Sequence, residues 1–248
     1  MTKRYKNPPL IEALCEFQFE TDVSWDLTLI GLVYDKLKEY FPKKQQLQLN
    51  LAIAATSETS EQVGNIPLLP LVRFLDKDEK TLFQLGQNLL TVNHLKPYSS
   101  WEEFSLIIEN VLKKYLETAK PEKLRHVAVR YINRIEVPKA NFNLEALFRF
   151  RPLIPTDLQK SIEAFFIGVN LPCEDVKDIL RIQLGTASSE TSDIIVLIFE
   201  IIYTFAQPGD IPLGDILQRV DVAHRNIEDA FEFCLTDELR QTFGEVKE

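Results

Sequence analysis

The sequence has few glycines and none of the glycine-rich motifs that hold phosphate groups. Only 8 of its 248 residues are glycine, and neither G-x-G-x-x-G nor G-x-x-x-x-G-K-[ST] occurs. Those motifs bring backbone amides close to a phosphate, so a phosphate-cradling loop is not expected. The serine-hydrolase elbow G-x-S-x-G and the protein-kinase signatures are absent as well. The sequence therefore predicts no cofactor and gives no direct indication of an enzyme.

Cysteine and histidine are also scarce, which argues against a disulfide framework and a metal centre. The three cysteines, Cys15, Cys173 and Cys234, are an odd number without a C-x-x-C pair, and each lies in an apolar stretch or beside a proline turn. A thiol in such a place usually behaves as a small buried hydrophobic group. The three histidines show neither H-E-x-x-H nor paired-histidine spacing, so no metal site is expected.

The chain has no apolar run long enough to span a membrane. The longest run of its C-terminal half, Ile194 to Phe199, is interrupted by Glu200 and is shorter than the roughly 18–20 residues that a membrane helix needs. The N-terminal segment is basic, but Glu12 and Glu16 interrupt the apolar stretch that a signal peptide requires. These observations predict a cytoplasmic protein without a membrane segment.

Acidic residues outnumber basic ones. There are 37 Asp and Glu against 28 Lys and Arg, which gives a net charge of −9 when the histidines are neutral. Binding to nucleic acid is not expected, because basic side chains supply most of the affinity for a phosphate backbone. An acidic surface suits a basic protein partner instead.

The overall composition is that of a folded protein with a substantial core. Hydrophobic residues make up 45% of the chain and charged residues 26%, close to the averages of globular proteins. A chain of this length buries roughly 70–75% of its surface on folding. The periodicity of the apolar residues predicts an α+β fold in which antiparallel meanders pack against long helices.

The first half of the chain, residues 1–138, begins with a strand from Leu10 to Glu20, where apolar and polar residues alternate. A helix capped by Ser24 and stopped by Pro42 follows, and then a strand from Leu47 to Ala54. A three-stranded meander, a helix that opens with a capping box, and a long strand complete this half. Their positions are Leu71–Leu75, Thr81–Leu85, Leu89–Leu95, Ser100 to before Pro121, and Leu124–Val137.

The second half, residues 139–248, shows a comparable order after an irregular junction. Three strands, a long helix and a short helix capped by Thr236 are expected. The strands span Ala164–Leu171, Ile179–Thr186 and Ile194–Phe205, the long helix runs from about Leu213 to Cys234, and Gly244 ends the short helix. Because each half has a meander followed by a long helix, we hypothesise a duplicated unit whose two copies pack together.

The strand around residue 132 carries the main candidate binding residues. Alternation places Arg130 and Arg134 on one face of the strand, and Tyr131 and Asn133 on the other. Two arginines about 7 Å apart are able to grip an anionic ligand or the carboxylates of a partner. The alternative, which we favour, is a ladder of salt bridges to acidic residues of a neighbouring strand. The acidic residues considered are Glu12, Glu16 and Glu20.

His224 is the remaining candidate binding residue. Asp221, three positions before it, and Glu228, four positions after it, lie on the same face of the predicted helix. A metal site needs a third or fourth protein ligand, and the other histidines are far away in the sequence. An ion-paired helix surface is therefore the preferred interpretation.

Four segments together resemble an uncharacterised family of prokaryotic proteins of about this length, which occurs sporadically across bacteria and archaea. They are residues 7–13 (NPPLIEA), 98–104 (YSSWEEF) and 129–135 (VRYINRI), and a C-terminal stretch that runs from Ala223 and His224 to residues 236–244 (TDELRQTFG). The resemblance covers nearly the whole chain but implies no activity. The sporadic distribution of the family implies a mobile accessory gene, such as those of defence or toxin–antitoxin systems.

Two hypotheses about function follow. The first is a non-enzymatic module that binds a protein partner, as an antitoxin-like or defence-associated accessory protein. The second is a binder of a small molecule or anionic ligand, or an unrecognised hydrolase, with a pocket between the sheet and the C-terminal helix that uses Arg130, Arg134 or His224. Self-association through a sheet edge or a helix is compatible with both hypotheses.

Overall fold

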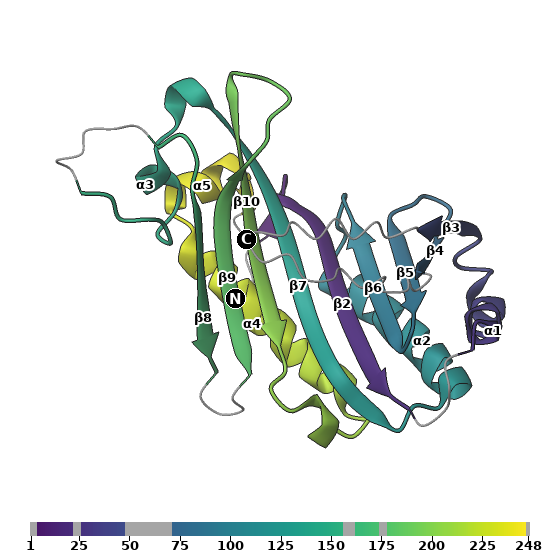
Figure 1. Ribbon diagram of the computed structural model, residues 1–248. Helices are drawn as coiled ribbons and strands as arrows, with labels where there is room; N and C mark the ends of the chain where they lie inside the picture. Colours follow the sequence, from purple (N-terminus) through teal and green to yellow (C-terminus); the bar gives the residue numbers. More distant parts are fainter. Residues whose placement is uncertain (1–3, 22–25, 48–70, 156–161, 174–177, 247–248) are drawn as a thin grey trace, which may run out of the picture.

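The chain folds around one large antiparallel sheet. The computed structural model describes residues 4–21, 26–47, 71–155, 162–173 and 178–246. Nine strands form the large sheet in the order β3-β4-β5-β6-β2-β7-β10-β9-β8, and two short strands form a separate sheet (Figure 1). The predicted α+β class with antiparallel strands is confirmed.

The elements have the following bounds. The strands of the large sheet are β2 (Leu10–Glu20), β3 (Lys43–Leu47), β4 (Leu71–Leu75), β5 (Thr81–Gly86), β6 (Leu89–Leu95), β7 (Lys123–Pro138), β8 (Phe166–Pro172), β9 (Ile179–Ala187) and β10 (Ile194–Thr204). The helices are α1 (Thr28–Leu37), α2 (Trp101–Ala119), α3 (Leu144–Leu147), α4 (Ile216–Cys234) and α5 (Asp237–Thr242), with 3-10 turns η1 (Lys139–Asn141) and η3 (Pro208–Asp210). The small sheet pairs β1 (Arg4–Tyr5) with β11 (Glu245–Val246). None of the helices in the described ranges combines the length and the hydropathy needed to cross a membrane.

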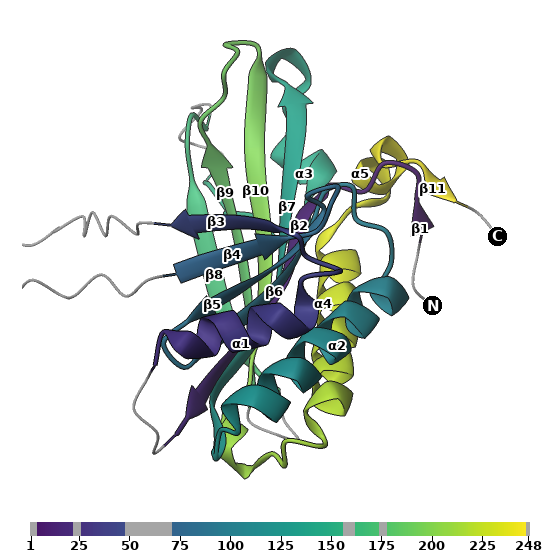
Figure 2. The ribbon, with the colours of Figure 1, turned by 90° about the vertical axis from the view of Figure 1, so that its right-hand side faces the viewer.

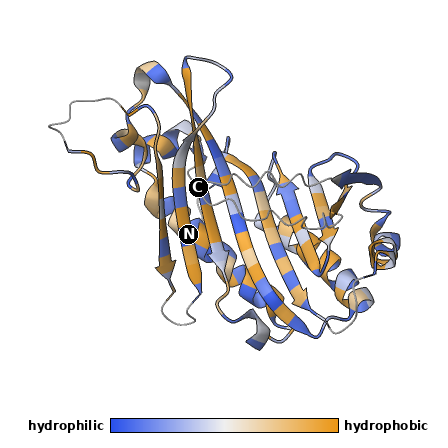
Figure 3. Cartoon of the chain, in the orientation of Figure 1, coloured by the Kyte–Doolittle hydropathy of each residue, from blue (hydrophilic) through white to orange (hydrophobic). Residues whose placement is uncertain are grey.

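Hydrophilic and hydrophobic residues alternate along strands of the large sheet (Figure 3). Because successive side chains of a strand point to opposite faces, this alternation gives the sheet one apolar and one polar face. On β2, Cys15 and Phe17 are fully buried, and so are their partners on β7, Val129 and Val127. Helices α1, α2 and α4 all lie on one side of the sheet (Figure 2), and α4 packs against β7 and β10. The core is therefore the layer of apolar side chains between the sheet and these helices.

The opposite face of the sheet carries a row of hydrogen-bonded polar side chains that crosses four neighbouring strands. Its three bonds run from Arg73 to Gln84, from Gln84 to Asn93 and from Asn93 to Glu12, at 2.8, 3.1 and 2.7 Å. Each of these side chains thus has a hydrogen-bond partner on the neighbouring strand, as polar groups packed into a sheet usually do.

The expected charged ladder between β2 and β7 forms only in part. The two strands do pair, and Glu16 and Glu20 lie 3.8 and 3.3 Å from basic side chains of β7. Arg130, however, is ion-paired with Glu200 of β10, a strand that the sequence interpretation did not consider. The register places Arg130 opposite Ile202, so the neighbouring Glu200 is within reach of its side chain.

Apart from the additional edge strand β3, the order of the strands is symmetric about the pair β2–β7. On one side β2 is followed by β6, β5 and β4, and on the other side β7 is followed by β10, β9 and β8. Each meander leads into a long helix, α2 after β6 and α4 after β10. This order is what a duplicated unit would produce, with the second copy beginning at β7 instead of after Pro138. The duplication itself stays a prediction.

The predicted elements agree closely with the observed ones where the apolar period is strong. Strand β2 has the predicted bounds, and Ser100 caps α2 by accepting a hydrogen bond from the amide of Glu103 at 3.2 Å. Ser24 and most of the predicted strand from residue 47 to 54 lie outside the described residues. Strand β3, whose sequence is KKQQL, was not predicted because it has no apolar alternation. Helix α4 begins at Ile216, three residues later than expected.

Candidate functional site

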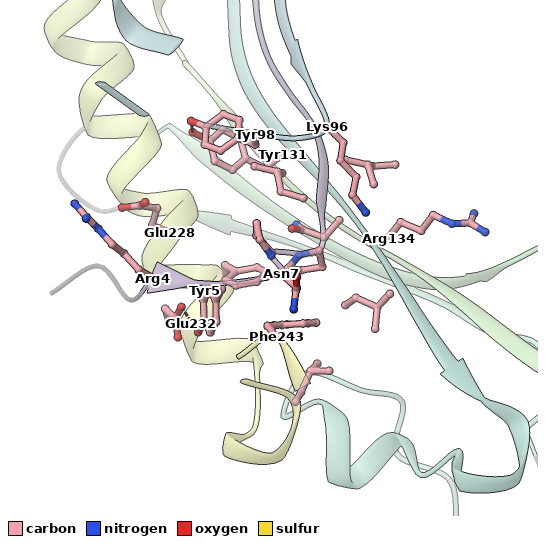
Figure 4. A pocket seen from close by; sticks show the side chains of 18 of the residues that line it. Arg4, Tyr5, Asn7, Lys96, Tyr98, Tyr131, Arg134, Glu228, Glu232 and Phe243 are labelled. Atoms are coloured by element: carbon pink, nitrogen blue, oxygen red, sulfur yellow. Dashed lines mark hydrogen bonds between the residues drawn. The ribbon is translucent and has the colours of Figure 1, made fainter. Parts of the chain in front are cut away.

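A cleft of about 1530 Å³ opens between one end of the sheet, α4 and the two ends of the chain. Its walls come from the segment before β2, the loop before α2, β7, α4 and α5 (Figure 4). The loop before α2 contains a cis peptide bond between Lys96 and Pro97 and presents Tyr98 to the cleft. Residues that are far apart in the sequence thus line one hollow.

The segment before β2 is held in place by the C-terminal end of the described chain. The backbone amides of Lys6 and Asn7 donate to the carbonyl oxygens of Gly244 and Phe243 at 3.1 and 3.0 Å. Gly244 has a φ of +70°, in the left-handed region that favours glycine. These contacts fix the outer wall of the cleft.

Four polar side chains form a chain of close contacts in the inner wall. The hydroxyl of Tyr131 on β7 lies 2.7 Å from Nδ1 of His224 on α4, and Nε2 of the same ring lies 3.3 Å from a carboxylate oxygen of Glu228. The hydroxyl of Tyr98 lies 3.5 Å from that of Tyr131. The Tyr131 hydroxyl donates to Nδ1 in the tautomer whose ring proton is on Nε2, the nitrogen nearer to Glu228. We call these four residues the Tyr–His–Glu chain.

Helix α2 contributes a tryptophan that covers His224. The indole of Trp101 stacks on the imidazole, with ring centroids 4.0 Å apart and planes 8° from parallel. Nε1 of Trp101 donates to Asp221 at 2.8 Å, so the carboxylate beside His224 orients the tryptophan. Among the residues that the structure describes, no group of three or more His, Cys, Asp or Glu side chains is placed to hold a metal ion.

Local sequence patterns explain why Tyr131 and His224 meet. Tyr131 shares the helix-covered face of β7 with Val129 and is 7% exposed. His224 is 5% exposed and lies on the apolar side of α4, between Val220 and Ile227. The interpretation of His224 as part of an ion-paired helix surface is therefore wrong in one respect. The imidazole does contact Glu228, but it is buried, and its shortest hydrogen bond is to a strand.

Burial changes the acidity of the two tyrosines in this chain. It raises the pKa of the Tyr131 hydroxyl well above its ordinary value, and it also raises the pKa of Tyr98. Both phenols therefore stay protonated at neutral pH. A protonated phenol donates and accepts hydrogen bonds, so the cleft presents neutral polar groups instead of a reactive phenolate.

The structure brings four of the five predicted binding residues to the cleft, namely Tyr131, Asn133, Arg134 and His224. Asn133 is buried, and its side-chain amide donates to a carbonyl of β10 at 3.1 Å. Arg134 lies at the edge of the cleft, where its Nε donates to Glu136 at 2.9 Å. Arg130 is not among the lining residues and points to the opposite face of the sheet.

Sequence reasoning missed most residues of the cleft, among them Lys96, Tyr98 and Trp101. Trp101 entered the sequence analysis only within the segment of residues 98–104 and was not singled out as a site residue. Its position directly after the capping Ser100 was the available signal, since the first turn of a helix has free backbone amides and often lies at a surface. Lys96 and Tyr98 belong to a loop, for which the sequence offers no periodicity.

Basic side chains surround the cleft on two sides. Figure 4 shows Lys96 and Arg134 on one side and Arg4 at the other end, with the tyrosines between them. Within the described part of the chain, no carboxylate pairs with the Lys96 amine. The lining as a whole is mixed in charge, because it also contains five acidic residues, and only the side around Lys96 is locally basic. The acidic lining residues are Glu102, Glu136, Glu228, Asp229 and Glu232.

No protein-family model matches this chain and no curated protein matches it significantly, so the resemblance to a sporadic prokaryotic family stays a prediction.

Proposed function

We propose that the protein binds a small anionic ligand in the cleft. The observation that carries this proposal is the Tyr–His–Glu chain in the wall of a hollow of about 1530 Å³. Ligand sites are typically concave and mostly apolar, with a few convergent polar groups. Because typical pockets measure about 300–1000 Å³, a ligand of ordinary size would occupy one part of this cleft.

The charges around the cleft favour an anion near Lys96. Two acidic side chains of the lining are already neutralised, Glu136 by Arg134 and Glu232 by Arg240, both at 2.9 Å. The Lys96 amine has no such partner among the described residues. A carboxylate or phosphate of a ligand would form a charge-assisted hydrogen bond with it.

The aromatic part of the lining suits an apolar or planar portion of the same ligand. The rings of Tyr98, Trp101, Phe231 and Phe243 all line the cleft. Aromatic rings provide large apolar contact areas at a small entropic cost, and tyrosine adds a polar tip. We therefore expect a ligand with one anionic end and one apolar body.

The hydrolase alternative has weaker support than binding. A hydroxyl, a histidine and a carboxylate in series also occur in nucleophilic enzymes. Here, however, burial raises the pKa of Tyr131, which disfavours the phenolate that would have to attack. Binding needs only the neutral hydroxyl that the cleft provides.

A protein-interaction role, as an antitoxin-like or defence-associated accessory protein, remains the second candidate. The net charge of −9 favours it, because an acidic surface suits a basic protein partner.

Metabolite capture tests the ligand proposal. Purified wild-type protein and a Lys96→Met variant are incubated with a metabolite extract and washed, and the released molecules are identified by negative-ion mass spectrometry. We expect an anion that the wild type enriches and the variant loses. Lys113→Met, at an exposed position of α2 away from the cleft, is the matched control and should capture the same anion. Capture of no anion by the wild type, or equal capture by Lys96→Met, would contradict the proposal.

A further inference from the structure

Strand β8 is an edge of the large sheet and exposes apolar side chains there. Phe166, Val169 and Leu171 are 71%, 39% and 45% exposed, and the strand, FIGVNLP, contains no charged residue. The other edge, β3, has the sequence KKQQL. Proteins protect edge strands from pairing with another chain by placing charges, lysine above all, on them. Strand β3 has this protection and β8 lacks it.

The backbone N–H and C=O groups of successive residues of β8 point alternately toward the neighbouring strand β9 and away from it. The amide of Thr186 donates to the carbonyl oxygen of Phe165 at 3.0 Å. In an antiparallel pair every second residue makes such bonds, so Phe166, Gly168 and Asn170 direct their N–H and C=O groups away from β9. In the described ranges no strand pairs with this side of β8.

We infer that β8 pairs antiparallel with β8 of a second copy of the chain, around a two-fold axis at Val169. This register aligns all seven residues of both strands. It places Val169 opposite its own equivalent and Ile167 opposite Leu171 of the second copy. Such cross-strand apolar pairs stabilise a sheet. Gly168 of one copy lies opposite Asn170 of the other, and their outward backbone groups supply the hydrogen bonds.

A second copy fits this edge better than a partner selected by charge. The net charge of −9 would attract a basic partner, but β8 offers that partner no carboxylate. The strand is instead complementary to itself, because apolar residues lie at equal distances on either side of Val169. A two-fold contact also uses the same edge of both chains and leaves no further β8 edge open.

The inferred dimer contains one continuous sheet with its helices on the same side. An antiparallel pair has its two-fold axis perpendicular to the sheet, so the two sheets become continuous and the helices of both copies lie on the same side. This contact is independent of the cleft, because no residue of β8 lines it.

The first test measures the mass of the protein in solution by light scattering after size-exclusion chromatography. We expect the wild type at twice the 28.6 kDa of one chain. Asn170→Pro removes an N–H that faces away from β9, so it should give a folded monomer, with circular dichroism as the check of folding. Asn170→Ala loses the same side chain but keeps the N–H, and it should remain a dimer.

The second test measures the register with disulfides in a Cys173→Ser background. Val169→Cys places two thiols on residues about 4.5 Å apart at Cα, which a disulfide can bridge. Leu171→Cys is the matched control, since its two copies are offset by about four residues, or about 14 Å. We expect mild oxidation to cross-link the first variant and not the second.

Each result supports or overturns the inference. A wild-type monomer at every concentration overturns it. A dimer that survives Asn170→Pro and is not cross-linked through Val169→Cys means that another surface associates. A complex with a different protein that Asn170→Pro abolishes, without a dimer of this chain, shows that β8 accepts a foreign strand instead.

Discussion

The hydroxyl of Tyr131 lies 2.7 Å from Nδ1 of His224, a residue 93 positions later in the chain. Tyr131 belongs to a central strand of the sheet, and His224 belongs to the long helix that packs on it. Both groups are buried, and the hydroxyl of Tyr131 is the hydrogen-bond partner of Nδ1 of His224. The inner wall of the cleft is therefore complete only when β7 and α4 have docked.

Replacing Tyr131 with phenylalanine should lower the free energy of unfolding by about 1–3 kcal/mol, because Nδ1 of the buried His224 loses its donor. Urea denaturation at neutral pH measures the change. Tyr115→Phe is the matched control, because Tyr115 is equally buried but has no hydrogen-bond partner among the described residues. We expect it to change stability by less than about 0.5 kcal/mol. Equal losses in both variants would contradict the role given to this hydrogen bond.

Asp178 is a buried carboxylate that joins the hairpin end of β9 to β10 and α4. It accepts hydrogen bonds from the Tyr203 hydroxyl at 2.9 Å, the amide of Ala206 at 2.9 Å and the guanidinium of Arg219 at 2.6 Å. Asp178→Ala should cost about 3–5 kcal/mol, because it leaves a partly buried cation unpaired. Asp210→Ala removes an exposed carboxylate and should cost little. Thermal denaturation compares the two variants, and similar melting temperatures would refute the assignment.

The free energy of unfolding should fall at alkaline pH because the thiol of Cys234 ionises more easily in the unfolded chain. Burial raises the pKa of this thiol from 9.0 to about 11. The unfolded chain therefore loses the thiol proton first, and raising the pH through the interval between these two values favours unfolding by about 1 kcal/mol at pH 10. Urea unfolding at pH 8 and pH 10 tests this expectation. The Cys234→Ala variant should lose less stability between the two pH values than the wild type, and an equal or larger loss would oppose the prediction.

The cap of α2 affects the cleft because the helix begins with Trp101. Ser100→Ala removes the acceptor for the amide of Glu103 and should cost about 1 kcal/mol. Ser105→Ala, inside the same helix, should be neutral or slightly stabilising, since alanine is the better helix former. Denaturation gives the energies, and tryptophan fluorescence in a Trp25→Phe background reports whether Trp101 keeps its stacked position on His224. Equal costs for the two serines would count against the cap.

The sequence predicts individual elements well where apolar and polar residues alternate strictly between the two faces of a strand. Strand β2 is found at its predicted bounds because Cys15, Phe17 and Phe19 alternate strictly with polar residues. The pairing of β2 with β7 could not be predicted, since the two strands are separated by residues 21–122 and alternation does not identify a partner. For the same reason, the sequence does not predict that both meanders belong to one sheet.

The candidate site could be predicted only as separate residues. Tyr131 and His224 were both named as candidate binding residues, Tyr131 beside the two arginines of its strand and His224 as part of an ion-paired helix surface, but their contact with each other was not predicted. Their contact depends on how α4 crosses β7, which is set by packing between elements. Lys96 and Tyr98 lie in a loop whose conformation local sequence patterns do not specify.

The central position of the β2–β7 pair has a consequence for biosynthesis. Strand β2 leaves the ribosome early, but its partner β7 follows only after residues 21–122 have been made. At about 5–20 residues per second, this interval is about 5–20 s. During this time β6 is able to cover only one edge of β2, while the other edge waits for β7. The nascent chain should therefore need chaperone protection most just before β7 emerges.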